Sequence, residues 1–406
     1  MRVLFVSDVY FPRVNGVSTS IRTFRADLAE AGVESVLVAP EYPGAAPEQE
    51  AGIIRIPSGG VPRDPEDRRF LGGPLRRALN SELAARVDLV HIHTPFIAHY
   101  AAVRFARAHR LPVVATYHTF FEDYLHHYLP LLPRAIGRFM ARRFTLSQCA
   151  DVAALIAPSA PMRDALLAYG VTQPIEVLPT GLPAESYARG DGARFRARFA
   201  LPADKPLVLY VGRVAHEKNI DFLLRMFVRL RALRPDALFL IAGEGPARVH
   251  LGKLARELGI SEQVRFVGYL NRQTELPDCY AAGDAFVFAS RTETQGLVLL
   301  EAMAQGTPVV STAELGTRSI LTPDCGAFVV NEEVETFAAT VAEALSLARD
   351  DPRRGQLRAS AESWASQAMA RRLIAFYEKV RAADRGALAN EKRGPVGTPL
   401  SVDRSS

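Results

Sequence analysis

The sequence predicts an α/β protein made of two successive halves, each a parallel sheet with helices on both faces. Two observations predict this fold class. Short apolar runs of strand length alternate along the chain with longer segments whose apolar residues recur at helical spacing. The same alternation continues through both halves of the 406 residues, which are enough for two or three domains.

The expected strands are short runs rich in valine, isoleucine, leucine and phenylalanine, which suit the buried strands of a parallel sheet. In the first half, strands are expected at 3–6, 35–39, 53–56, 89–92, 113–117, 152–156 and 175–178. In the second half, they are expected at 207–211, 237–241, 264–266, 285–289, 309–311 and 327–329.

Helical patterns fill most gaps between these strands, as the crossovers of a parallel sheet require. The first helix is expected over 18–31, where Ile21, Phe24 and Leu28 share one face and Gly32 follows as a cap. Each half therefore reads as a Rossmann-like domain, with ligand sites at the carboxyl ends of its strands.

Proline and glycine gather at 179–183, which predicts the boundary between the halves. The first domain is expected to cover 1–181 and the second 187–360. From 385 to 406 the chain is rich in glycine, proline, serine and charge without periodicity, so this segment is expected to be a disordered tail.

Composition excludes several classes of protein. With 48% hydrophobic and 23% charged residues, the chain is too apolar to be disordered. Its cysteines, Cys149, Cys279 and Cys325, lack metal-ligand spacing and fit reduced thiols in a cytoplasmic protein. The apolar run at 3–6 is too short for a signal peptide, and no apolar stretch reaches membrane-spanning length.

The formal net charge of +5 and the isoelectric point near 9.2 suit an anionic ligand. A nucleotide diphosphate, a nucleic acid and an acidic lipid surface all meet that description. Because the sequence has no helix-turn-helix, zinc-finger or aromatic stacking motif, we expect no nucleic-acid partner.

Two glutamates, Glu293 and Glu301, flank Gly296 and Leu297 at the start of a short predicted helix that Gly306 ends. The unpaired N–H groups and positive dipole end of a helix N-terminus suit a phosphate. The two carboxylates can accept hydrogen bonds from sugar hydroxyls on either side. The element therefore indicates a nucleotide-sugar site, although solvated surface carboxylates also occur at this spacing.

A pair of cations follows the strand expected at 207–211. Arg213 comes directly after it and Lys218 lies five positions further on. A guanidinium can bind two phosphate oxygens at once and an ammonium adds a mobile charge, so the pair suits a diphosphate. The alternative is two solvated cations at a turn between a strand and a helix.

Together these motifs resemble the retaining glycosyltransferases of family 4, over roughly 1–382. The resemblance implies the GT-B fold, in which two Rossmann-like domains face each other across a cleft. It also implies that the segment around 364–382 is a crossover helix that returns to the first domain.

The resemblance also implies roles for the motif residues. In the family pattern, Arg213 and Lys218 clamp the donor diphosphate beside the helix start at Gly296 and Leu297. Glu293 then positions the sugar, and Glu301 binds the ribose hydroxyls.

In the first domain, Gly16 resembles the glycine of the family's donor loop, and His118 resembles the histidine that contacts the transferred sugar. A neutral imidazole can hydrogen-bond a sugar hydroxyl there. His91 and His93 are expected to be structural or to line the pocket. Turns often contain glycine and most single histidines are structural, so these two assignments depend on the family pattern.

Many nucleotide-sugar enzymes hold a divalent metal on the diphosphate through an Asp-x-Asp loop. The sequence has no such motif, and Asp64, Glu66 and Asp67 are expected in a charged loop. We therefore expect no metal and no cofactor, with Arg213 and Lys218 in place of the ion.

A basic, apolar segment at 133–144 indicates the acceptor side. Pro133 can open a helix there, and a helix of this kind can lie on an anionic membrane or pack on its own domain. His118-Thr119, followed by Glu122-Asp123-Tyr124 and this segment, resembles the lipid-glycosylating branch of the family, notably diacylglycerol glucosyltransferases, which also has the Glu-Thr-Gln-Gly-Leu form found at 293–297. The helically spaced apolar residues of the segment are Ile136, Phe139 and Met140, and its basic residues on another face are Arg134, Arg138 and Arg142.

The expected function is retaining transfer of a hexose, most simply from UDP-glucose, to a lipid acceptor such as 1,2-diacylglycerol. The expected location is cytoplasmic, at the inner face of the membrane. Three alternatives stay open: a GDP-mannose-dependent alpha-mannosyltransferase acting on a lipid or glycan, a nucleotide-sugar epimerase, and a non-catalytic binding module.

Overall fold

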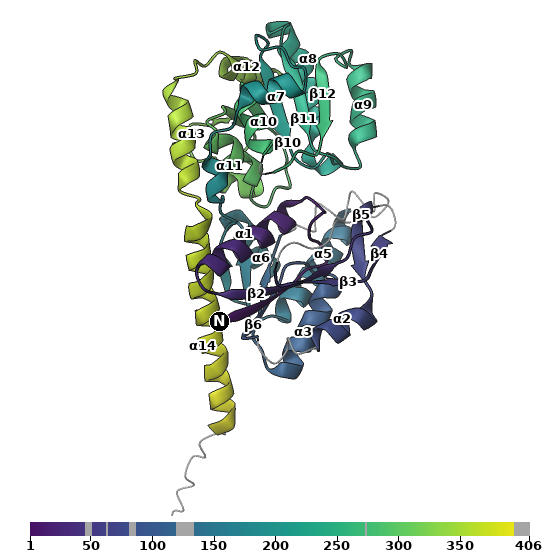
Figure 1. The fold of residues 1–406 in the computed structure, drawn as a ribbon, viewed down its shortest axis with the longest axis vertical. Helices are drawn as coiled ribbons and strands as arrows, with labels where there is room; N and C mark the ends of the chain where they lie inside the picture. Colours follow the sequence, from purple (N-terminus) through teal and green to yellow (C-terminus); the bar gives the residue numbers. More distant parts are fainter. Residues whose placement is uncertain (45–50, 62–63, 81–86, 119–133, 273, 394–406) are drawn as a thin grey trace, which may run out of the picture.

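A computed structural model of the chain describes residues 1–44, 51–61, 64–80, 87–118, 134–272 and 274–393. These residues form two α/β domains stacked along the long axis of the molecule, with the last helix, α14 (Ser366–Arg393), running beside the first domain (Figure 1). The two Rossmann-like domains that the sequence predicts are therefore present.

The first domain contains a seven-stranded sheet in the order β3-β2-β1-β6-β7-β8-β9. Every neighbouring pair is parallel. Strands are added toward one edge of the sheet from β1 to β3 and toward the other edge from β6 to β9, so the switch point, where Rossmann-like folds bind ligands, lies between β1 and β6. The strands are β1 (Arg2–Val6), β2 (Glu34–Pro40), β3 (Ile53–Ile56), β6 (Leu89–Ile92), β7 (Val113–Thr116), β8 (Ala154–Ala157) and β9 (Ile175–Val177).

Helices cover both faces of this sheet because successive strand side chains point to opposite faces. Val3 and Phe5 of β1 pack against α1 and α14, whereas Leu4 and Val6 belong to the core on the other face. The helices of the first domain are α1 (Gly16–Glu30), α2 (Gly72–Leu79), α3 (Ile97–His109), α5 (Arg134–Ala150) and α6 (Ala160–Tyr169).

The second domain repeats the plan with a six-stranded parallel sheet in the order β12-β11-β10-β13-β14-β15, so its switch point lies between β10 and β13. Its strands are β10 (Leu207–Val211), β11 (Leu238–Ala242), β12 (Val264–Gly268), β13 (Ala285–Phe288), β14 (Val309–Ser311) and β15 (Phe328–Val329). Its helices are α7 (Gly192–Arg198), α8 (Ile220–Leu233), α9 (Arg248–Glu257), α10 (Leu276–Ala282), α11 (Leu297–Ala304), α12 (Val334–Leu345) and α13 (Pro352–Glu362).

The chain passes between the domains twice, and the two crossings are hydrogen-bonded to each other. The Leu182 N–H donates to the Trp364 carbonyl at 2.7 Å, and the Ser366 N–H donates to the Leu182 carbonyl at 2.9 Å. A Cβ on Gly181 would lie 2.2 Å from the Ser366 Cα, so only glycine fits at this close approach. The predicted boundary at 179–183 is thus one of two paired crossings between the domains, which together are called the hinge.

Every strand expected from the sequence is found in one of the two sheets, but two other expectations are wrong. Asp64–Phe70 is a strand, β5, and not a loop; it pairs antiparallel with β4 (Ser58–Val61). The charge-rich sequence conceals it, because a two-stranded ribbon need not bury a continuous apolar face. The tail also begins later than expected, because α14 continues to Arg393; residues 394–406 lie outside the described residues.

Helix α14 packs on the first sheet through Met369, Leu373, Phe376, Tyr377 and Val380, which is the return to the first domain that the family resemblance implies. Within the part of the chain that the structure describes, no helix combines the length and apolarity needed to cross a membrane.

Candidate active site

A cleft of about 700 Å³ lies between the domains at the carboxyl ends of their strands. The loops after β1 and β6 line it from the first domain, and those after β10 and β13 line it from the second, so both switch points open into the same space. All the residues proposed from the sequence as site residues line this cleft: Gly16, His118, Arg213, Lys218, Glu293, Gly296, Leu297 and Glu301.

The element that holds the two glutamates folds as expected. Helix α11 starts at Leu297, and Gly296 precedes it with a φ of +98°, a left-handed conformation that favours glycine. Glu293 lies on the loop before the helix and Glu301 lies within it. The backbone N–H groups of the first turn have no side-chain cap, and the helix start at Gly296 and Leu297 lines the cleft. This is the geometry of an anion site.

Lys218 is paired with Glu293. Its Nζ atom lies 2.7 Å from Oε2 of Glu293, and both side chains are about one-fifth exposed. Lys218 belongs to the 3₁₀ segment η3 (His216–Lys218), which follows the loop after β10. The pair places one cation and one carboxylate beside the start of α11.

Arg213 also lines the cleft. One of its terminal nitrogens lies 3.4 Å from Oε1 of Glu217, which is long for a charge-assisted hydrogen bond. Its side chain is mostly buried, with 14% exposed. Because a guanidinium can bind two phosphate oxygens at once, Arg213 is suited to binding a diphosphate in the cleft that it lines.

Glu301 is held by two residues that sequence reasoning missed. The Tyr280 hydroxyl donates to its Oε2 at 2.8 Å, and Arg272 forms an ion pair with its Oε1. Burial lowers the pKa of the Arg272 guanidinium to about 10. Arg272 comes four residues after β12 in a segment without a motif, so nothing in its local sequence indicates the pairing. Before a ribose could use both Glu301 oxygens, Arg272 would have to share or leave this carboxylate.

His118 is part of a group of three histidines from adjacent strand ends. Nε2 of His118 lies 3.2 Å from Nδ1 of His93. Burial lowers the pKa of the His118 imidazole to about 4, so the ring is neutral near pH 7. His91 lies deeper and is hydrogen-bonded to the hydroxyls of Tyr377 and Thr116, so it has a structural role. His93 lines the cleft, and His91 is absent from its lining residues.

The loop before α11 contacts the first domain directly. The Thr294 hydroxyl donates to the His118 carbonyl at 3.1 Å, and the Ser159 hydroxyl donates to the Thr294 carbonyl at 2.8 Å. The Gln295 amide makes two hydrogen bonds to the backbone of Thr180, at 2.8 and 2.6 Å. These contacts place Glu293 and His118 at the same cleft, although the two residues lie in different domains.

In the first domain, Gly16 begins α1 and faces open space, because a Cβ built on it would meet no atom within 4 Å. The Asn15 side chain caps this helix by accepting from the Ser18 N–H at 2.8 Å. The backbone at Gly16 is therefore accessible from the cleft. The residues at 119–124, which the family resemblance associates with the acceptor side, lie outside the described residues.

Comparison with known proteins identifies the family. A family model described as Glycosyltransferase Family 4 matches residues 14–186, and one described as Glycosyl transferases group 1 matches residues 191–364. The chain is 32% identical over 319 residues to the alpha-monoglucosyldiacylglycerol synthase of Streptococcus pneumoniae, covering 77% of this chain and 71% of that protein. The chain belongs to glycosyltransferase family 4.

Other comparisons agree with this assignment. The GDP-mannose-dependent alpha-mannosyltransferase of Mycobacterium tuberculosis is 29% identical to this family 4 glycosyltransferase over 329 residues, covering 80% of this chain and 82% of the relative. The solved structure of sucrose-phosphate synthase from Thermosynechococcus elongatus has a TM-score of 0.76 at 21% identity and covers 94% of this chain and 99% of that one. The expected GT-B fold is confirmed.

Asp8 also lines the cleft, and we expect it to make the folding stability of this glycosyltransferase depend on pH. Its buried carboxylate accepts from the Thr94 hydroxyl at 2.8 Å and from the Ala98 N–H at 3.0 Å. Burial is the largest effect on this carboxyl and raises its pKa from 3.8 to about 6. The folded state therefore binds this proton more tightly than the unfolded state. The stability that Asp8 contributes is fully present below pH 3.8 and is lost as the pH rises through 6.

We predict that Asp8→Asn removes this pH dependence, because an amide does not titrate. Between about pH 4 and pH 7, the free energy of unfolding of the variant relative to wild type should rise by about 2 kcal/mol. Urea unfolding at each pH measures it, with the exposed Asp164→Asn as the control. If the difference in unfolding free energy between the variant and wild type stayed constant with pH, the raised pKa of Asp8 would be contradicted.

Proposed function

We propose that this glycosyltransferase moves a hexose from a nucleotide diphosphate sugar, UDP-glucose in the simplest case, to a lipid acceptor such as 1,2-diacylglycerol, with retention of anomeric configuration. The observation that carries the proposal is a set of groups that line the same cleft: Arg213, Lys218 and the N-terminus of α11 beside Glu293. This set is complementary to a diphosphate joined to a sugar.

Donor binding would change the partners of Lys218. In the structure its ammonium is paired with Glu293; a diphosphate between Arg213 and the start of α11 would compete for it. Released from Lys218, the Glu293 carboxylate would accept hydrogen bonds from the sugar hydroxyls. The exchange replaces one ion pair with another, so neither charge has to be buried without a partner.

Transfer with retention would follow front-face attack. The acceptor hydroxyl oxygen forms a bond to the anomeric carbon as the bond from that carbon to the phosphate oxygen breaks, and the acceptor proton passes to the departing phosphate. Arg213 and Lys218 would stabilise the negative charge that develops on the leaving group. Neutral His118 would hold a sugar hydroxyl by a hydrogen bond. No glutamate forms a covalent bond to the sugar in this scheme.

We propose that the two cations also make a metal on the diphosphate unnecessary. Donor transfer should then keep its kcat in the presence of a chelator. A loss of kcat that added Mg²⁺ restores would contradict this part of the proposal.

The lipid acceptor is supported by similarity to the Streptococcus pneumoniae synthase and by the surface of α5. Ile136, Phe139 and Met140 on this helix are 49%, 63% and 50% exposed. The opposite side of α5 packs on its own domain through Ala141 and Cys149. Such an apolar surface with neighbouring arginines suits the interface of an anionic membrane, so we propose a peripheral location at the inner face. Pro133 lies outside the described residues.

A GDP-mannose-dependent reaction is the second candidate, because the Mycobacterium tuberculosis relative bears that name at nearly the same identity. The cleft groups named above are proposed to bind the diphosphate and the hexose. UDP-glucose and GDP-mannose both contain a diphosphate and a hexose, so these groups do not distinguish the two donors. Comparison of donors therefore has to decide between them.

The first test is transfer of labelled sugar from UDP-glucose, UDP-galactose, UDP-N-acetylglucosamine and GDP-mannose, each offered diacylglycerol micelles or a pool of soluble glycans. We predict labelled glycolipid from UDP-glucose. In Glu293→Gln, kcat/KM should fall by a factor of about 100 to 1,000, because a contact to the reacting sugar is lost. The exposed Glu335→Gln in the same domain is the control and should behave as wild type.

Label from GDP-mannose alone would favour the second candidate, and label in the soluble pool alone would contradict the lipid acceptor. Isomerised sugar nucleotide formed without any acceptor would indicate an epimerase. Full activity of Glu293→Gln would contradict the assigned role of this residue.

For the membrane, we predict that the double variant Phe139→Ser and Met140→Ser binds anionic vesicles about tenfold or more weakly than wild type, since each side chain would leave an apolar interface. Vesicle co-sedimentation measures this. The control is Leu233→Ser, at a similarly exposed position of the second domain. Because all three side chains are at least half exposed, thermal unfolding should be unchanged. Equal vesicle binding by the double variant and wild type would contradict the role of α5.

A further inference from the structure

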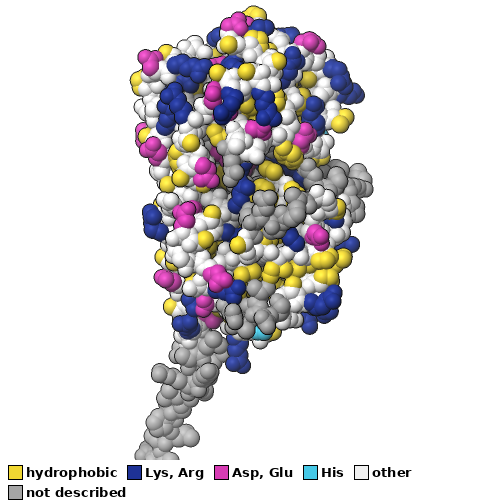
Figure 2. Space-filling model, viewed as in Figure 1, with side chains coloured by type: hydrophobic (Ala, Val, Ile, Leu, Met, Phe, Trp, Pro, Cys, Tyr) yellow, Lys and Arg dark blue, Asp and Glu magenta, His cyan; other side chains and the backbone are white. Residues whose placement is uncertain are grey.

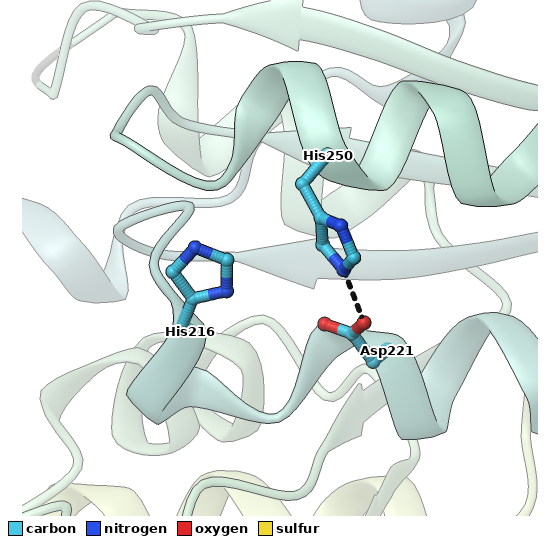
Figure 3. A group of neighbouring side chains, drawn as sticks. All are labelled: His216, Asp221 and His250. Carbon is cyan, nitrogen blue, oxygen red and sulfur yellow. Dashed lines mark hydrogen bonds and ion pairs between the residues drawn. The ribbon is translucent and has the colours of Figure 1, made fainter. Parts of the chain in front are cut away.

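The second domain contains a cluster of metal-ligating side chains outside the cleft. His216, Asp221 and His250 each offer a ligand atom, and these atoms all lie within 4.8 Å of one another. In Figure 3 the three side chains converge from three separate segments. They come from η3, the first turn of α8 and the first turn of α9. The residues that line the cleft do not include any of them.

The geometry is close to that of a metal centre. His250 Nε2 lies 2.6 Å from Asp221 Oδ2, and the rings of His216 and His250 are 5.4 Å apart between centroids. Ligands on one zinc ion, at about 2.0–2.2 Å from it, lie roughly 3–4 Å from one another. The ligand atoms of the cluster all lie within 4.8 Å of one another, so they come near this spacing.

The type of ligand decides the type of metal. Two imidazoles and one carboxylate suit zinc, cobalt or nickel, whereas Mg²⁺ and Ca²⁺ prefer sites made of oxygen. Three protein ligands leave the fourth zinc position for water.

We propose that His216, Asp221 and His250 form a binding site for one divalent transition-metal ion, with Zn²⁺ the best match, which braces the segment that carries Lys218. The ion replaces the hydrogen bond between His250 and Asp221 and ties η3 to α8 and α9. Because His216 and Lys218 belong to the same short segment, holding one restricts the other. The site is structural and takes no part in the chemical step.

The test uses the full chain without an affinity tag, stripped of metal with a chelator. Zn²⁺ is titrated by calorimetry, and Co²⁺ by its visible absorption, which reports tetrahedral coordination. We expect one ion per chain, with Mg²⁺ showing no competition. His216→Ala, Asp221→Asn and His250→Ala should each weaken binding by more than about tenfold, since even loss of a residue that only supports a ligand has that effect.

The matched control is His109→Ala, an exposed histidine of α3 in the other domain. The cysteines Cys149, Cys279 and Cys325 are buried and should not compete for metal. In chelator, the four variants should unfold at the same temperature as wild type, which shows that they are folded. Binding at wild-type strength in any of the three cluster variants would overturn the site, as would equal weakening by His109→Ala.

A second readout follows from linkage. At free Zn²⁺ about 100 times the wild-type dissociation constant, the unfolding equilibrium constant of wild type should fall about 100-fold, and that of His250→Ala should fall by about tenfold or less. No stabilisation of the wild type would overturn the proposal.

If the metal restricts Lys218, it should also change donor binding, a prediction that rests on the proposed function. Zn²⁺ should lower the KM for the nucleotide-sugar donor about fivefold with kcat unchanged, in wild type and in His109→Ala but not in His250→Ala. An unchanged KM with Zn²⁺ bound would overturn the bracing role. Metal binding itself is measured without a sugar donor, so failure of the site and failure of the transferase assignment are distinguishable.

Discussion

The site depends on the loop from Glu293 to Gly296, which belongs to the second domain but is hydrogen-bonded to the first. Thr294 contacts the His118 backbone and Ser159, and Gln295 binds both backbone groups of Thr180. These bonds place the N-terminus of α11 opposite the strand ends of the first sheet. They connect the loop that carries Glu293 to the first-domain segment that carries His118.

The same loop lies close to the hinge. Thr180 and Gly181 precede Leu182, which is hydrogen-bonded to the second crossing at Trp364 and Ser366. Gln295 therefore connects the loop before α11 to the backbone two residues before the point where the two crossings are hydrogen-bonded. On the face shown in Figure 2, basic and acidic side chains are interspersed over both domains. Arg213 and Lys218 both line the cleft.

Much of this could be predicted from sequence because it depends on local patterns. The parallel strands appear as separate apolar runs, and Glu293, Gly296 and Glu301 stand in a short motif around one helix start. The partners of those residues could not be predicted in the same way. Arg272 reaches Glu301 across a turn without a motif, and Gln295 reaches Thr180 from 115 residues away. The strand Asp64–Phe70 was missed because its charges hide the alternation, and α14 extends beyond its apolar face, where composition alone indicated a tail. Long-range pairing leaves no local trace in one sequence.

The central claim is that the diphosphate of a nucleotide sugar binds between Arg213, Lys218 and the start of α11. A crystal structure of the protein with bound UDP tests it most directly. We predict the diphosphate at the N–H groups of Gly296 and Leu297, with Lys218 turned from Glu293 to a phosphate oxygen and the nucleoside directed toward Glu301. A nucleotide bound outside the cleft, or inside it with the Lys218–Glu293 pair intact and the phosphates remote from α11, would contradict the account.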